Sequence, residues 1–205
     1  MYIKSNIFKV DFDNLTDWTD GDTNGAVSEI DPAGQLHLDC ISMTATGYAK
    51  RSKDLGTVGS GNYYVEVRFK GDTWDYLGSR VLICAGTNFF QATFKGSDAG
   101  NNGIYIYDGA TDNKVLAKDW DNNWHTVVFY IHNSQTDCDI WVDKSPSESA
   151  DVTDADCSTS TFGDGYTELY GYGTVAGNGE YHVDYVYVGD DVDNTSPLPT
   201  FKNPE

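Results

Sequence analysis

The segment 119–144 constrains the fold of this chain more than any other stretch. From Trp124 to His132, β-branched and aromatic residues fill nearly every position, in two alternating sets that would point to opposite faces of a strand. Such a run is typical of a strand that is buried on both faces. After a polar turn at 133–136, apolar residues recur at every second position over 138–142, which predicts a returning strand. We therefore expect a long antiparallel hairpin at the centre of the core.

The rest of the sequence favours an all-β class. Short apolar runs separated by turn residues recur throughout, and 205 residues suit one domain of two packed antiparallel sheets. A capping-box spacing at 145–148, with Pro at the first helical position, predicts one short helix inside an acidic loop at 143–165. We expect a domain over 1–189 and an acidic, Pro-rich tail or linker over 190–205. The other predicted strands cover 8–12, 26–30, 35–41, 63–70, 80–85, 88–94, 104–107, 114–117, 166–172 and 180–188.

Four cysteines are present, and none shows the spacing of metal ligands. Cys40 and Cys84 share strand faces with leucines, which predicts buried thiols. Cys138 and Cys157 could close a loop by a disulfide, but the sequence leaves the pairing open.

A Trp-His pair opens the central strand at Trp124, and the returning strand reads IWVD at 140–143. The entry segment 8–15 reads FKVDFDNL, and the exit segment 182–188 reads HVDYVYV. Together these stretches resemble the laminin-G-like branch of the concanavalin A-like lectin and glucanase superfamily. The resemblance implies an antiparallel β-sandwich, the concanavalin A-like jelly roll, over most of the chain. This sequence has Lys144 where such domains usually have a glycine after the Val-Asp pair.

Charge limits the partners of the protein. With 13 Lys and Arg against 32 Asp and Glu, the formal net charge is −19, which opposes binding to nucleic acid or to anionic membranes. Cations, neutral sugars and basic protein surfaces are compatible partners, although acidity can also serve solubility alone. The N-terminal segment lacks a signal-peptide pattern, and no segment approaches membrane-spanning length. We expect an extracellular or virion-surface location. The protein would reach it either after removal of a signal peptide or by another route.

Calcium is the first candidate ligand. Asp20, Asp22 and Asn24 open a D-x-D-x-N-G sequence that places hard oxygen ligands at alternating positions, as calcium loops do. The closing residue is Asp31, where the longer Glu is usual, and Pro32 prevents the flanking helix. An ordinary Asp- and Gly-containing turn explains the same residues.

The resemblance implies a second calcium site. Related jelly rolls hold a structural calcium between acidic groups of the first strand and an Asp of the last strand. The matching residues here are Asp11 or Asp13, together with Asp184. The alternative is an Asp that is paired by hydrogen bonds at a strand edge.

Carbohydrate recognition is the second candidate, because sugar sites combine aromatic faces with polar groups that bind hydroxyls. Trp74 and Tyr76 lie in a loop rich in Gly and Asp, where an indole lacks an obvious packing role. Most aromatic residues must still belong to the core. The predicted platform comprises Trp74, Tyr76, Arg68, Tyr105, Tyr107, Trp120, Tyr170 and Tyr172.

Catalysis has the weakest sequence support. No segment carries the Glu-x-Asp-x-x-Glu order of related glucanases, Gln91 lacks the His of a lyase motif, and His125 is expected in the core as a hydrogen-bonded imidazole. We therefore expect a non-catalytic carbohydrate-binding or adhesion module whose partner is a polysaccharide or glycan. One alternative is a structural or surface-decoration protein, such as a virion component, whose tail docks on a neighbouring protein. The other is a polysaccharide lyase or glycoside hydrolase with unfamiliar site residues.

Overall fold

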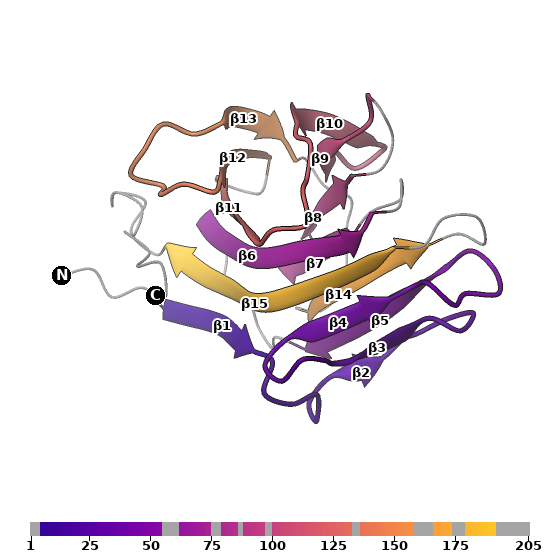
Figure 1. Ribbon diagram of the computed structural model, residues 1–205. Helices are drawn as coiled ribbons and strands as arrows, with labels where there is room; N and C mark the ends of the chain where they lie inside the picture. Colours follow the sequence, from indigo (N-terminus) through magenta and orange to yellow (C-terminus); the bar gives the residue numbers. More distant parts are fainter. Residues whose placement is uncertain are drawn as a thin grey trace.

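The computed structural model describes residues 5–54, 62–74, 79–85, 88–96, 100–132, 136–157, 166–173 and 179–191. Within these ranges the chain forms two antiparallel sheets, one of eight strands and one of seven, that pack face to face (Figure 1). The predicted all-β sandwich is therefore confirmed. No described part of the chain forms a helix that could cross a membrane.

The eight-stranded sheet faces the viewer in Figure 1, with β6 and β15 at its centre. Its strands run in the order β13 (Val152–Asp156), β12 (Asp137–Val142), β11 (His125–Ile131), β6 (Asn62–Thr73), β15 (Glu180–Asp191), β4 (Leu36–Asp39) and β3 (Val27–Ile30), and β1 (Ser5–Asp11) also pairs with β15. The seven-stranded sheet lies behind it. Its order is β10 (Asp112–Ala117), β9 (Gly103–Tyr107), β8 (Asn88–Lys95), β7 (Ser79–Ala85), β14 (Tyr166–Gly173), β5 (Gly47–Asp54) and β2 (Thr19–Asp20).

The core fills the space between the sheets. Because side chains alternate along a strand, every second residue of β6 and β11 points inward. Burying each large apolar side chain of this kind contributes about 1.5–3 kcal/mol. The inward residues of the two strands are Val65, Val67, Phe69, Val127, Phe129 and Ile131, all at most 1% exposed.

The central hairpin forms as the sequence predicts. β11 pairs with β12 in a register that places Val127 opposite Val142 and Phe129 opposite Ile140. The expectation that β11 is buried on both faces is wrong in part, because Thr126 and Tyr130 on its second face are only half-buried. That second face lies on the outer surface of the sheet, and it lines a pocket described below.

The segment after the hairpin differs from its prediction. The acidic stretch expected to be a loop contains β13, whose single buried residue, Ala155, gives too weak an alternation to mark a strand. The short helix expected at Ser145 is one turn, in which Glu148 N donates to Ser145 O. The chain cannot continue as a helix because Asp151 already pairs with the end of β12, where its carboxylate accepts from Val142 N.

Several expectations concern residues at or beyond the edge of the described chain. Tyr76 and residues 192–205, most of the predicted tail, lie outside the described residues, while β15 continues to Asp191, past the expected start of that tail. The side chain of Cys84 lies outside them too. Cys40 is a buried thiol, as expected, and Cys138 and Cys157 are fully buried thiols that are not joined in a disulfide.

Candidate functional site

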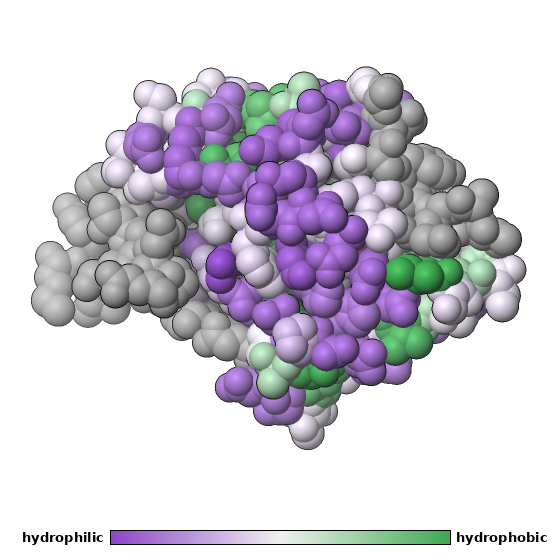
Figure 2. Space-filling view, viewed as in Figure 1, coloured by the Kyte–Doolittle hydropathy of each residue, from purple (hydrophilic) through white to green (hydrophobic). Residues whose placement is uncertain are grey.

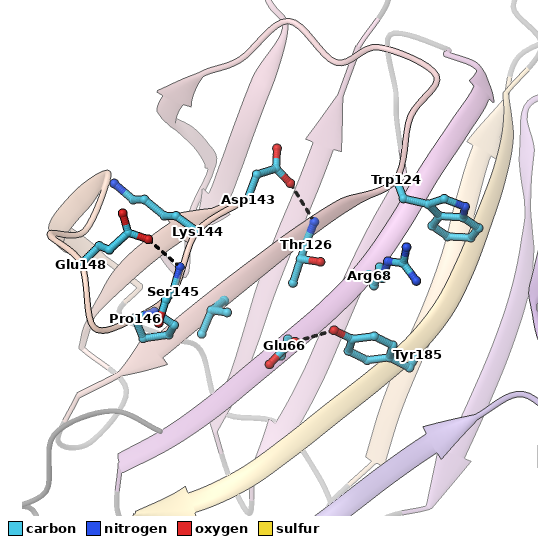
Figure 3. A pocket seen from close by; sticks show the side chains of 11 residues that line it. Glu66, Arg68, Trp124, Thr126, Asp143, Lys144, Ser145, Pro146, Glu148 and Tyr185 are labelled. Carbon is cyan, nitrogen blue, oxygen red and sulfur yellow. Dashed lines mark hydrogen bonds between the residues drawn. The ribbon is translucent and has the colours of Figure 1, made fainter. Parts of the chain in front are cut away.

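A pocket of about 550 Å³ lies on the outer face of the eight-stranded sheet, beneath the loop that follows β12 (Figure 3). The alternation that sends Val65 and Val67 into the core turns Glu66 and Arg68 of β6 outward into this pocket. β11 contributes Thr126 and Val128, β15 contributes Tyr185, and Trp124 closes one end. Loop residues within 143–148 form the wall. The face of the molecule in Figure 2 is mostly hydrophilic, so a pocket that contains an indole is distinctive there.

Glu66 and Tyr185 form a fixed polar pair at the floor of the pocket. Glu66 is only 4% exposed, and the Tyr185 hydroxyl donates to its Oε1 at 2.5 Å. Burial, reinforced by the hydrogen bond to Glu66, raises the pKa of Tyr185 well above its usual value. The phenol therefore stays protonated and donates to Glu66, which gives the floor a defined hydrogen-bond pattern.

Arg68 occupies the centre of the pocket. Its Nη1 donates to Asp184 Oδ2 at 2.6 Å, and its guanidinium lies 5.2 Å from the centre of the Trp124 ring. Lys70 Nζ lies 5.6 Å from the same ring. Cations over an indole hold the ring in place, with an attraction of about 0.5–1 kcal/mol each when partly exposed. The structure thus orients Trp124 through two neighbouring side chains of β6.

The wall of the pocket is held by several hydrogen bonds. Asp143 has a positive φ of 56° and accepts from Thr126 N at 2.9 Å. Lys144 Nζ pairs with Asp151 at 2.8 Å, and Ser145 N donates to Glu148 Oε1 at 3.0 Å. The turn therefore forms without the glycine that related domains use. Its many bonds make the wall a preformed part of the site.

His125 lies behind this wall and is a core histidine, as the sequence predicts. Its side chain is 6% exposed, and its two ring nitrogens lie 2.8 Å and 3.0 Å from Asp143 and Asp121. Both nitrogens are thus hydrogen-bonded to carboxylates. This arrangement fixes the orientation of the ring and leaves it a structural role.

The expectation that Trp74 lacks a packing role is wrong. Its indole stacks on Trp120, with ring centres 5.9 Å apart, and contacts Phe69 and Tyr181 edge-on. Trp120 is 7% exposed and also packs on Phe94 of the opposite sheet. These five residues form what we call the Trp74–Trp120 cluster. A loop position suggested exposure, but Trp74 directly follows β6 and its indole packs against the core.

Three of the predicted tyrosines that the structure describes, Tyr105, Tyr107 and Tyr170, lie on the outer face of the seven-stranded sheet with Tyr172, away from Arg68. Tyr105 is 8% exposed and Tyr170 is 6% exposed, and Tyr170 contacts the ring of Tyr172. The Tyr107 hydroxyl donates to Gly109 O at 3.0 Å. The predicted carbohydrate platform therefore divides between two opposite faces. The structure brings Arg68 together with Trp124, which the sequence placed on the same face as Thr126 and Val128 without marking it as a site residue.

The acidic residues of the predicted calcium loop make contacts within the protein. Asp22 accepts from Ser28 N, Ser28 Oγ and Lys50 N, each at 2.7 Å. Asp20 accepts from Asp22 N, and Asn24, at φ 55°, donates to Thr46 O. This is the ordinary turn that the sequence left open as the alternative. Calcium at this loop stays a prediction.

One expected ligand of the second predicted calcium site forms an ion pair, and calcium there stays a prediction. Asp184 is engaged by Arg68, which matches the alternative of a paired carboxylate. Asp13 is exposed, and the side chain of Asp11 lies outside the described residues. Groups of acidic and histidine side chains close enough to hold one ion occur elsewhere in the described chain, around His37 and around His132.

No protein-family model matches this sequence, and a search of curated proteins gives no match either. Solved structures do match. Peanut lectin, in complex with a nine-residue peptide, superposes with a TM-score of 0.62 at 8% identity, over 89% of this chain and 96% of the lectin. A putative β-glucanase from Mycobacterium abscessus gives 0.61 at 16% identity, over 90% and 100%. A carbohydrate esterase of the Shiga toxin-encoding bacteriophage phi24B gives 0.57 at 12% identity, over 92% and 99%.

Proposed function

The fold is that of the concanavalin A-like lectin and glucanase superfamily, and from this premise we propose that the protein is a non-catalytic carbohydrate-binding module. We place glycan contact in the pocket under the β12 loop. The proposal rests on one observation, the combination of Trp124 with Glu66, Arg68 and Tyr185 in one preformed cavity. Lectins and carbohydrate-active proteins among the similar structures support a carbohydrate ligand.

The pocket chemistry matches what a sugar ring presents. A pyranose has an apolar face that packs on an indole and a rim of hydroxyls that both donate and accept hydrogen bonds. Trp124 supplies the aromatic surface, Arg68 supplies donors, and the Tyr185 oxygen, whose proton is donated to Glu66, supplies an acceptor. Because Arg68 and Tyr185 are already held by Asp184 and Glu66, little conformational entropy remains to be lost on binding.

Charge favours a neutral glycan. The two cations that line the pocket are already paired within the protein, Arg68 with Asp184 and Lys144 with Asp151. An anionic sugar would have to displace these carboxylates and would approach a chain of net charge −19. We therefore expect the affinity to change by less than about twofold when ionic strength rises from about 0.05 M to about 0.5 M.

We further propose an extracellular or virion-surface location, where polysaccharides are available, and contact of the C-terminal tail with a neighbouring protein. The lack of a glucanase-type acidic motif supports a binding role over hydrolysis. A structural surface-decoration protein and a lyase or hydrolase are the competing functions, and the experiment below separates all three.

The test is a glycan array with the full chain, using Trp124→Ala as the site variant and Tyr172→Ala, on the opposite sheet, as the matched control. We expect binding that Trp124→Ala weakens by roughly 30-fold, about 2 kcal/mol, while Tyr172→Ala leaves it intact. Loss in Tyr172→Ala alone would move the site to the seven-stranded sheet. A blank array would favour the structural role, and release of reducing ends or unsaturated sugars would contradict a non-catalytic module.

A further inference from the structure

Two buried histidines face each other on the outer face of the eight-stranded sheet, where His182 pairs with the Lys70 position of β6. His37 of β4 and His182 of β15 are directly opposed in the register of these strands. Their rings stack with centres 4.5 Å apart and planes inclined by 11°. His37 is 8% exposed and His182 is 6% exposed. Because both imidazoles lie on the outer face of the sheet, packing of the core between the sheets does not explain their burial.

Carboxylates approach both rings. His37 Nε2 lies 3.1 Å from Glu180 Oε1, and His182 Nε2 lies 3.1 Å from Asp72 Oδ2. Glu29, on the neighbouring strand β3, lies 3.8 Å from His37 Nδ1. Ligand atoms of His37, Glu180 and His182 all fall within 4.8 Å of one another, close enough to share one ion. These residues come from strands that pair with each other, so the sheet itself fixes their spacing.

The histidines also have unsatisfied polar atoms. Nδ1 of His37 and Nδ1 of His182 are buried, and neither has a hydrogen-bond partner among the residues that the structure describes. Leaving such an atom buried without a partner destabilises the folded protein. Because Nε2 of His182 already contacts Asp72, its Nδ1 is the nitrogen that an ion would take, whereas on His37 the nitrogen beside Glu180 is Nε2. This observation is independent of the clustering of acidic side chains.

We propose that His37, His182 and Glu180 form a binding site for a divalent transition-metal ion, with zinc as the physiological candidate. Imidazole nitrogen combined with carboxylate oxygen suits zinc, nickel, cobalt and copper, whereas calcium takes oxygen ligands. Asp72, beside His182, orients that ring from outside the ligand set. The ion would join β4 to β15 at the outer surface. The site is separate from the proposed glycan pocket and does not depend on it.

The test is metal binding to the full chain after treatment with a chelator. Calorimetric titration with zinc should give one site, and cobalt should give visible absorption bands typical of nitrogen ligation. Neither calcium nor magnesium should compete. His182→Gln and Glu180→Gln should each weaken zinc binding by at least about tenfold, while His132→Gln, which alters the other histidine-centred cluster, should leave it unchanged.

A second measurement covers the case in which the His182 variant fails to fold. Glu180 is only partly buried, so Glu180→Gln should retain the apo melting temperature, and ring nitrogen shifts in the NMR spectrum of the unmutated protein should report zinc at two histidines. No zinc binding at millimolar concentration would overturn the proposal. Binding that survives in Glu180→Gln and His182→Gln, or that disappears in His132→Gln, would overturn it as well.

Discussion

The Trp74–Trp120 cluster and the Trp124 pocket use the same side chain for different purposes. Trp74 and Trp120 leave loops and insert between the sheets, where their neighbours are the aromatic rings of Phe69 and Phe94. Trp124 stands at the start of a core strand, yet its neighbours are Arg68 and Lys70 on the outer face. The difference shows that the neighbours supplied by other strands, and not the local sequence context, decide whether an indole packs or binds.

The largest effect should follow from Trp120→Ala. This change removes contacts with both sheets, and we expect it to lower the free energy of unfolding by about 3–5 kcal/mol, as for other buried aromatic residues. Urea unfolding followed by circular dichroism measures the change. A loss below about 1 kcal/mol would mean that the cluster contributes little to stability. Trp120 would then not differ from Trp124 in its importance for folding.

Gly96→Ala should have the next largest effect. A Cβ at Gly96 would lie 2.5 Å from Trp74 Cδ2, and the indole cannot retreat because Gly71 and Trp120 also contact it. We expect a loss of about 1–3 kcal/mol from this overpacking. Gly21→Ala is the matched control, because its Cβ would meet the flexible end of Lys50. Equal losses in the two variants would argue against tight packing around Trp74.

Alkaline pH should weaken the pocket through the Tyr185 phenol. The pKa of Tyr185 is raised in the folded protein by burial and by Glu66, so its contribution to stability is complete below the ordinary pKa of about 10 and is lost as pH rises above it. Tyr185→Phe should therefore lose less stability above pH 10 than the unmutated protein.

Above pH 10, the free energies of unfolding of the unmutated protein and of Tyr185→Phe should diverge by well under about 1.4 kcal/mol per pH unit, because the Tyr185 ring is only half-buried. Tyr187, whose pKa burial also raises, remains in the variant and should preserve part of the alkaline loss. Unfolding curves at several pH values above 9 provide the measurement. Identical pH profiles would show that the Tyr185 hydroxyl is not linked to folding.

Trp124→Ala should have the smallest effect on folding. Its ring is half-buried and contacts two flexible cations, so we expect the free energy of unfolding to change by less than about 1 kcal/mol. Denaturation of this variant beside Trp120→Ala is the sharpest version of the comparison. A loss as large as that of Trp120→Ala would make Trp124 a packing residue and would weaken the case for the pocket.

Much of the fold could be predicted because apolar and polar residues alternate along individual strands. The hairpins of β3 with β4 and of β11 with β12, and the inward set of β6, follow from patterns within a few residues. β5 and β13 escaped prediction because their sequences are largely polar, and pairing with a neighbouring strand is what orders them. β5 pairs with β14, which is distant in sequence, whereas β13 pairs with β12, the strand just before it.

The sites were harder to predict than the strands. Arg68 was identified by its outward position on β6, but its partners Trp124 and Tyr185 reach the pocket from strands far along the chain. His37 and His182 show no recognisable ligand spacing, because they meet only through the pairing of β4 with β15. Sequence predicts which face a side chain takes, whereas strand order and register decide what it meets there.

The pairing of β1 with β15 has a mechanical consequence. These strands are antiparallel, with Ser5 opposite Asp190, so the start of the first strand lies beside the end of the last (Figure 1). A force that separates these two points loads one rung of hydrogen bonds at a time, from that end inward. β1 should then separate from the sheet at low force, because its hydrogen bonds to β15 break one after another. β15 remains paired with β6 along its other edge. Attachment through a single end would spare the molecule this weakness.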